Sequence, residues 1–204
     1  VLGPMEIAGL TELSPIWRPL LEALTAHIPV QWTAGPRPAQ HAAMKIDPIR
    51  ETTDEARTLA RQLLEGARHA SLGTLDPDTG VPLVTRIALQ TDADGAPLAL
   101  LSGLAAHTRA LAADPRAGLL IASETARGDA MTHARLSILG RAAPVAPDEG
   151  RRARWLARDP KAKVYLDLPD FRFWRIEPIS ALLNAGFGQA FRLLPPDMLN
   201  PPAE

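Results

Sequence analysis

Three short strand-like segments follow one another in the middle of the chain, with only turns between them. The segments are Ala70–Leu75, Pro82–Leu89 and Pro97–Leu101. The residues between them, Asp76–Gly80 and Asp92–Gly95, are of the types that form tight turns. Consecutive strands joined by short turns pair antiparallel, because a parallel pair needs a long crossover. This feature argues against a doubly wound parallel sheet.

The rest of the chain adds strands and helices of similar short length. Further strands are expected at Ala117–Ala122, Ala134–Arg141, Phe171–Ile176 and Ser180–Ala185. Helices are expected at Thr52–Gly66, Leu104–Ala113 and Asp148–Arg158. A capping box from Thr52 to Glu55 opens the first of these helices. Six or seven short strands interrupted by helices predict a mainly β fold of the α+β class, a small antiparallel barrel with helices at its edges.

The two ends of the chain differ from this body. Residues 1–48 form a Pro-rich extension in which Ser14 and Pro15 open a short helix that runs to about Ile28. We expect this extension to pack on the body or on a partner; the alternative is that Met44 is the native start. The body covers residues 49–194, and residues 195–204 form a Pro-rich C-terminal tail.

Composition excludes several classes of function. The chain has no cysteine, which excludes disulfides, Cys-ligated zinc, iron–sulfur clusters and thiol catalysis. The net charge of -1 argues against a nucleic-acid partner. We find neither an apolar run of the ~18 residues that a membrane span needs nor a signal peptide, so we expect a cytoplasmic protein with no membrane partner.

The segment with the clearest chemistry runs from Leu101 to Arg109, where a strand passes through a small-residue loop into a helix. Ser102, His107 and Thr108 crowd this junction. A helix start offers unpaired backbone N–H groups that suit a phosphate, and hydroxyl and cationic side chains would complete such a site. Arg86 on the neighbouring strand could add a forked donor. The alternative is that the hydroxyls cap the helix and that Arg86 is a solvated strand residue.

At this point the sequence resembles a known family, the pyridoxamine 5'-phosphate oxidase-like flavoproteins with an FMN-binding split barrel, and within it the heme-utilisation branch. The resemblance covers about Thr52 to Arg192. It is carried by the order and spacing of Leu101–Thr108, Ala113–Arg116, Ala134–Gly140, Arg158–Ala162, Asp170–Phe171 and Gly186–Ala190. It implies a six- to seven-stranded antiparallel split barrel with flanking helices, and a homodimer with two FMN sites at the subunit interface. It also implies an FMN-dependent oxidoreductase acting on a small molecule.

Carried over residue by residue, the resemblance implies a set of cofactor-binding positions. Thr85, Arg86 and Ile87 would lie along the flavin and its phosphate arm. Ser102, His107 and Thr108 would bind the phosphate, with His107 favoured as the cation. Met131 or Arg135 would touch the ring, from the loop Asp129–Arg135 of the other subunit. No catalytic residue and no metal site is assigned.

Two other functions stay open. A heme-binding or heme-degrading protein of the same fold needs an iron ligand, and the family places a histidine late in the chain for this purpose. None of the five histidines here lies beyond residue 133, which leaves His69 and His133 as candidates. The third possibility is a binding module that has kept the barrel and lost the cofactor.

Overall fold

The structure, a computed structural model, describes residues 5–8, 22–23, 25, 27–28, 30–33, 49–123, 129–146, 148–186 and 188–200. It divides into two units, Val1–Asp47 and Pro48–Glu204. In the first unit, β1 (Met5–Ala8) pairs in parallel with β2 (Val30–Thr33). Most of the helix expected up to Ile28, and Met44, lie outside the described residues.

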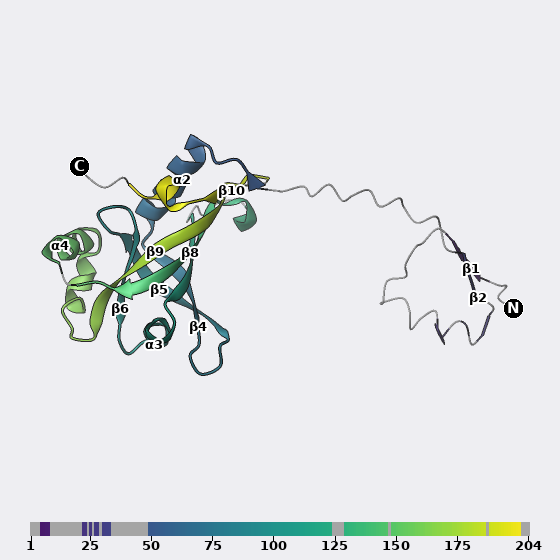
Figure 1. Cartoon of the computed structure of the whole chain (residues 1–204), viewed down its shortest axis with the longest axis horizontal. Helices are drawn as coiled ribbons and strands as arrows, with labels where there is room; N and C mark the ends of the chain where they lie inside the picture. The colour runs from purple at the N-terminus through teal and green to yellow at the C-terminus, as the bar shows by residue number, and fades with distance from the viewer. Residues whose placement is uncertain are drawn as a thin grey trace. The chain divides into compact units, whose positions relative to one another are not determined.

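The second unit is built on an antiparallel barrel (Figure 1). Its strands are β4 (His69–Leu75), β5 (Pro82–Thr91), β6 (Pro97–Ser102), β7 (Arg116–Ala122), β8 (Arg135–Pro144) and β9 (Phe171–Asn184). They are ordered β9-β6-β5-β4-β7-β8, and the pairing of β8 with β9 closes the ring. The predicted antiparallel barrel is therefore confirmed, including the meander of three strands at its start.

β9 corrects one prediction, because the two strands expected at Phe171–Ile176 and Ser180–Ala185 are a single strand. Its pairing with β8 continues through the middle with a register shift: Leu139 faces Ser180, whereas Gly140 faces Pro178. The extra residue is a β-bulge, a place where a proline without an N–H group is tolerated. On its other edge, the first part of β9 pairs with β6 and its end pairs with β10 (Ala190–Leu193).

Helix α2 (Asp54–Gly66) lies against the barrel and buries Ala56, Ala60 and Leu64 in the main core. Its N-cap is Thr53, whose hydroxyl accepts from the N–H group of Ala56, and not Thr52 as the capping box predicted. Thr52 instead donates to the carbonyl of Arg192 at 2.7 Å. This contact also fastens β3 (Ile49–Arg50), which pairs in parallel with β10.

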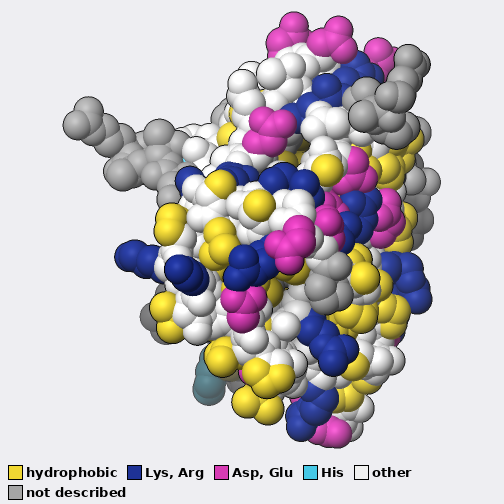
Figure 2. Space-filling model, turned by 90° about the vertical axis from the view of Figure 1, so that its left-hand side faces the viewer, with side chains coloured by type: hydrophobic (Ala, Val, Ile, Leu, Met, Phe, Trp, Pro, Cys, Tyr) yellow, Lys and Arg dark blue, Asp and Glu magenta, His cyan; other side chains and the backbone are white. Residues whose placement is uncertain are grey.

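A second, smaller core lies outside the barrel, under α4 (Glu149–Arg158) and the 3-10 helix η3 (Pro160–Val164). Trp155 of α4 is 1% exposed and meets Phe173 of β9 edge to face, with ring centroids 5.4 Å apart. Figure 2 views the side of the molecule that carries α4, where acidic, basic and hydrophobic side chains are interspersed. No helix among the described residues is long and apolar enough to cross a membrane.

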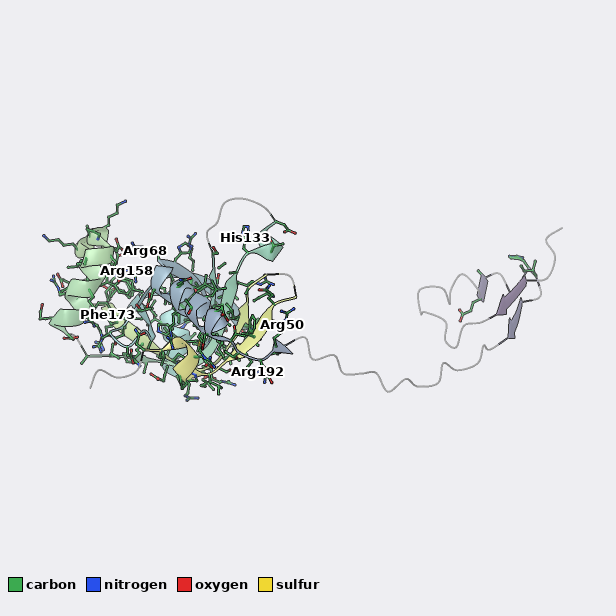
Figure 3. All side chains as sticks on the ribbon, turned by 90° about the horizontal axis from the view of Figure 1, so that it is seen from above. Arg50, Arg68, His133, Arg158, Phe173 and Arg192 are labelled. Atoms are coloured by element: carbon green, nitrogen blue, oxygen red, sulfur yellow. The ribbon has the colours of Figure 1, made fainter. Side chains whose placement is uncertain are left out.

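The carboxyl ends of α2 and α4 bind each other's arginines (Figure 3). Arg158, the last residue of α4, donates to the carbonyls of Glu65 and Ala67 at the end of α2. Arg68, just after α2, donates to the carbonyl of Arg158 at 2.6 Å. Helix ends leave carbonyls without partners, and cationic donors are favoured there. The remaining helices of the described residues are α3 (Ala106–Ala113), η2 (Ala130–Thr132) and α5 (Pro195–Met198), the last within the predicted tail.

Candidate functional site

The junction of β6 and α3 brings together several residues that the sequence assigned to a phosphate site. The hydroxyl of Ser102 donates to the carboxylate of Asp170 at 2.6 Å and accepts from the N–H group of Leu104. The hydroxyl of Thr108 donates to the carbonyl of Ser102 at 2.7 Å. Both hydroxyl protons are therefore committed within the protein. A phosphate at this place would also meet the negative charge of Asp170.

His107 lies beside Thr85, with its Nδ1 atom 3.1 Å from the threonine hydroxyl. The ring is half-buried, and burial lowers the pKa of His107 below its usual value because it disfavours the charged form. The protein alone therefore does not favour the imidazolium cation that the sequence led us to expect. Thr85 and His107, which the sequence assigned to different parts of the cofactor site, are therefore neighbours within this chain.

Two arginines, Arg86 and Arg109, follow Thr85 and Thr108 directly in the sequence. Arg86 pairs with Ser71 and is exposed, and its side chain points away from that of Thr85 because side chains alternate along a strand. Arg109 of α3 lies 3.4 Å from the carboxylate of Asp78. The start of α3 still offers backbone N–H groups, but a phosphomonoester is usually held with fixed cations as well. The junction fits the phosphate of FMN poorly, and its assignment to FMN stays a prediction.

The other predicted positions are spread over the barrel. Ile87 is 4% exposed and packs in the main core, so its side chain faces no solvent-filled site. The side chain of Met131 lies outside the described residues. Arg135 begins β8 and pairs with Asn184 on β9 and Ala122 on β7. Its side chain lies on the solvent side of the barrel, since the next residue, Leu136, is in the core.

That solvent side of β5, β4, β7, β8 and β9 forms a surface that the sequence did not reveal, here called the outer face. Its side chains come from two neighbouring rows across the strands. One row is Arg86, Ser71, Leu120, Ser137, Leu182 and Arg192, and the other is Val84, Gly73, Gly118, Leu139 and Ser180. Val84, Leu120, Leu139 and Leu182 are 42–69% exposed. Strand alternation was the signal that could have found this surface, but it needed the strand registers.

A histidine and an arginine border the outer face at one end. His69 precedes Ser71 by two residues on β4, and Arg135 precedes Ser137 by two residues on β8. Alternation places both side chains on the outer side, and both are partly buried. His69 also lines a cavity of about 220 Å³ with Ala122 and Ser123. Of the candidate iron ligands, His69 is thus the one placed by a barrel strand, whereas His133 sits in the loop before β8.

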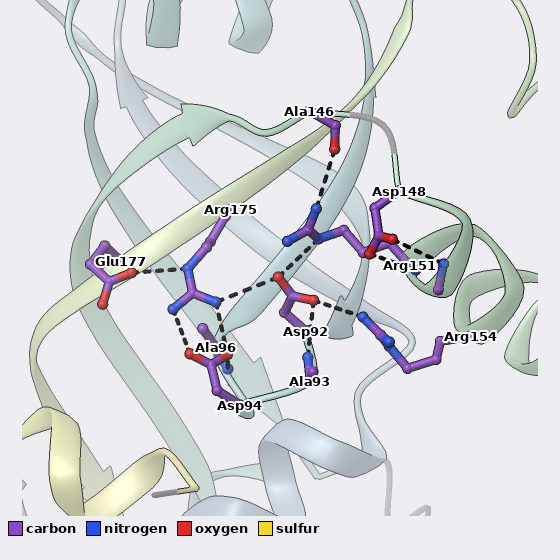
Figure 4. A network of polar contacts seen from close by, with 11 residues as sticks. Asp92, Ala93, Asp94, Ala96, Ala146, Asp148, Arg151, Arg154, Arg175 and Glu177 are labelled. Carbon is purple, nitrogen blue, oxygen red and sulfur yellow. Dashed lines mark hydrogen bonds and ion pairs between the residues drawn. The ribbon is translucent and has the colours of Figure 1, made fainter. Parts of the chain in front are cut away.

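The largest polar cluster of the described residues is structural and lies elsewhere (Figure 4). Asp92, with 5% of its side chain exposed, accepts from Arg151 and Arg154 of α4 and lies 3.5 Å from Arg175 of β9. Burial alone would raise the pKa of Asp92, but hydrogen bonds from the backbone and from Arg151 outweigh it and keep the pKa low. The cluster ties α4 to the β5–β6 turn.

Comparison with known proteins identifies the fold. A family model described as pyridoxamine 5'-phosphate oxidase matches residues 57–183, from α2 almost to the end of β9. A solved structure that is 86% identical covers 74% of this chain and 100% of that chain, with a TM-score of 0.72. The matched region contains the whole barrel. The split barrel expected from the sequence is therefore confirmed.

The similar proteins with functional names include two heme proteins. The chloroplastic heme oxygenase HOZ of Arabidopsis thaliana is 32% identical over 155 residues, which are 74% of this chain and 44% of the relative. The chain therefore spans less than half the length of this curated relative. The structure of a heme binding protein from Mycobacterium smegmatis is 27% identical. It covers 73% of this chain and 61% of that chain, with a TM-score of 0.63.

Proposed function

Because the chain belongs to the pyridoxamine 5'-phosphate oxidase-like family, we propose that it is a heme-binding protein of that family that acts as a homodimer. The single observation that carries the proposal is the similarity to the Arabidopsis heme oxygenase and to the mycobacterial heme binding protein. This reverses the order expected from the sequence, in which an FMN-dependent oxidoreductase came first and heme was the alternative. The cytoplasmic location stays a prediction, since the Arabidopsis relative is chloroplastic.

The β6–α3 junction supports this choice over FMN. A flavin mononucleotide brings a phosphate of about two negative charges, which in proteins is met by cations and donated hydrogen bonds. At the junction, Ser102 donates to Asp170 instead, and burial disfavours the cation of His107. On the outer face, by contrast, a carboxylate ligand would meet cations. Arg86 and Arg192 stand at the two ends of the row that contains the apolar side chains of Leu120 and Leu182.

The outer face offers the residue types that heme needs. Leu120 and Leu182, in the row nearer to His69, would contact the porphyrin ring at the edge of the outer face, and Arg135 would meet a propionate carboxylate of heme. His69 would ligate the iron, since neutral imidazole is a common axial ligand. Bound heme would supply an iron centre able to bind oxygen, so the same protein could store heme or degrade it.

A homodimer would explain why the outer face is apolar. Contiguous exposed apolar side chains usually mark an interaction surface. The small residues Ser71, Gly73, Gly118 and Ser137 lie next to the exposed apolar side chains in these rows, which lets another flat surface approach closely. A second copy of the chain is the partner that we propose, because a two-fold axis needs only one such self-complementary face. Heme held beside this face would contact both subunits.

A paired titration tests the proposed function. The full chain is titrated with hemin and, separately, with FMN, and followed by the Soret band and by flavin fluorescence. We expect about one heme per chain and FMN binding at least tenfold weaker. His69→Ala should shift the Soret maximum, because the axial ligand changes, whereas His107→Ala at the β6–α3 junction of the same unit should leave the spectrum unchanged.

Three results would contradict this proposal. Micromolar FMN binding without a heme spectrum would restore the flavoprotein reading. Uptake of neither cofactor would favour the cofactor-free binding module. A Soret band that is the same in His69→Ala would remove His69 as the ligand. If heme binds, addition of a reductant in air distinguishes storage, in which the Soret band persists, from degradation, in which it decays.

A further inference from the structure

A cavity of about 720 Å³ belongs to neither the β6–α3 junction nor the outer face. It lies between the start of α4, the 165–169 loop that follows η3 and the strand pair β6 and β9. This is the side of the molecule shown in Figure 2. Cavities of ~300–1,000 Å³ are the size that takes a small organic ligand.

The floor of this cavity is apolar and aromatic. Leu100, Leu166 and Phe173 are each at most 8% exposed and belong to the second core. Phe171 adds a second ring, and Val145 closes one side. Because these side chains are packed against Trp155 and Ala162, the floor is preformed rather than assembled by a ligand. Such a floor favours a flat apolar molecule.

The charged side chains that line the cavity are either engaged within the protein or exposed to solvent. Arg152 forms a bidentate pair with Asp167, at 3.1 and 2.6 Å. Both oxygens of Asp148 accept from backbone N–H groups at the start of α4. The remaining lining charges, Glu149 and Arg172, are exposed and of opposite sign. A charged ligand would therefore lose its hydration without gaining an uncommitted buried partner.

From these observations we infer that the cavity is a second binding site, for an uncharged, mainly apolar aromatic small molecule. Size, a preformed aromatic floor and a lining whose charges are engaged or exposed all point to this class of ligand. The inference does not depend on the proposed heme site, since the two use different faces of the barrel. Its occupant packs on Phe173, so its arrival should be sensed by Trp155.

Two probes that differ by one charged group test the inference. N-phenyl-1-naphthylamine is neutral, and 8-anilinonaphthalene-1-sulfonate has the same rings with an added sulfonate. We expect the neutral probe to bind at least tenfold more tightly to the full chain and to quench tryptophan emission. Ala146→Phe fills the rim of the cavity from an exposed position and should weaken the neutral probe at least tenfold. Ala112→Phe, exposed on α3 and outside the cavity lining, should not.

Four outcomes of these titrations decide whether the cavity is a second binding site. Tighter binding of the sulfonate would mean that the site selects anions and would overturn the inference. Equal affinity in wild type and Ala146→Phe would place the probe elsewhere. Displacement of the neutral probe by one equivalent of heme would mean that the two ligands share a site. Failure of heme to bind at all, with probe binding retained, would leave the inference standing and remove only the proposed function.

Discussion

At the scale of single residues, the β6–α3 junction shows how a contact distant in sequence changes the chemistry of a motif. Ser102 and Thr108 have the spacing of a phosphate site, and the structure does bring them together. The residue that alters their chemistry is Asp170, which is 68 positions away from Ser102. Local sequence could predict the hydroxyls, but not the carboxylate that takes the proton of Ser102.

The same junction gives a prediction about pH. The folded protein lowers the pKa of His107, whereas the unfolded chain has the ordinary value near 6.5. Between these two values the unfolded state binds more protons, so stability is complete above about pH 6.5 and falls as the pH falls below it. The loss stays below ~1.4 kcal/mol per pH unit, because a single imidazole binds at most one proton.

This loss is measured by urea unfolding of wild type and His107→Gln between pH 7.5 and 5. Carboxylates titrate equally in both proteins, so the difference between the two curves isolates His107. We expect wild type to lose more stability than the variant as the pH falls. Parallel curves would show that the buried ring does not resist protonation.

At the scale of elements, the sequence predicted the strands and helices that local patterns determine. It missed the one feature that depends on pairing with a distant strand. The β4–β6 meander and α4 were predictable, because alternation, turn residues and the Asp148 cap are local signals. The continuity of β9 was not, since Glu177, Pro178 and Ile179 look like a break. Their pairing with β8 across a bulge keeps them in the strand.

Gly140 is the residue that permits this pairing. A Cβ atom at that position would lie 2.5 Å from the carbonyl oxygen of Glu177, a backbone atom that cannot rotate away. We expect Gly140→Ala to destabilise the protein by about 1–3 kcal/mol, because β8 and β9 must separate locally. Urea midpoints measure this cost. Gly66→Ala is the control, since a Cβ atom there meets nothing within 4 Å; an equal effect of both changes would refute the role of Gly140.

At the scale of the whole molecule, the barrel separates its surfaces by chemistry. The α4 side has its own core and a polar cluster around Asp92, whereas the outer face leaves its leucines in solvent. A protein rarely keeps such a contiguous apolar patch without a partner. The family resemblance implied the dimer, and only the strand registers identify the surface that would make it.

Substitution on this surface tests the dimer directly. Leu139 is 59% exposed on the outer face, between Gly118 and Ser180. Leu139→Glu would place a carboxylate in the contact that we propose with the second copy. We expect light scattering after gel filtration to give a dimer for wild type at tens of micromolar and a monomer for the variant, because a buried unpaired carboxylate is costly. Val164→Glu is the matched control: Val164 is 83% exposed but lies on η3, away from the outer face, so this variant should stay dimeric. A wild type that is monomeric, or a Leu139→Glu variant that remains a dimer, would mean that the outer face meets something other than a second copy.

Heme titration of the monomeric variant then decides whether the cofactor needs both subunits. Weaker binding than in wild type places the heme across the interface, and unchanged binding confines it to one chain.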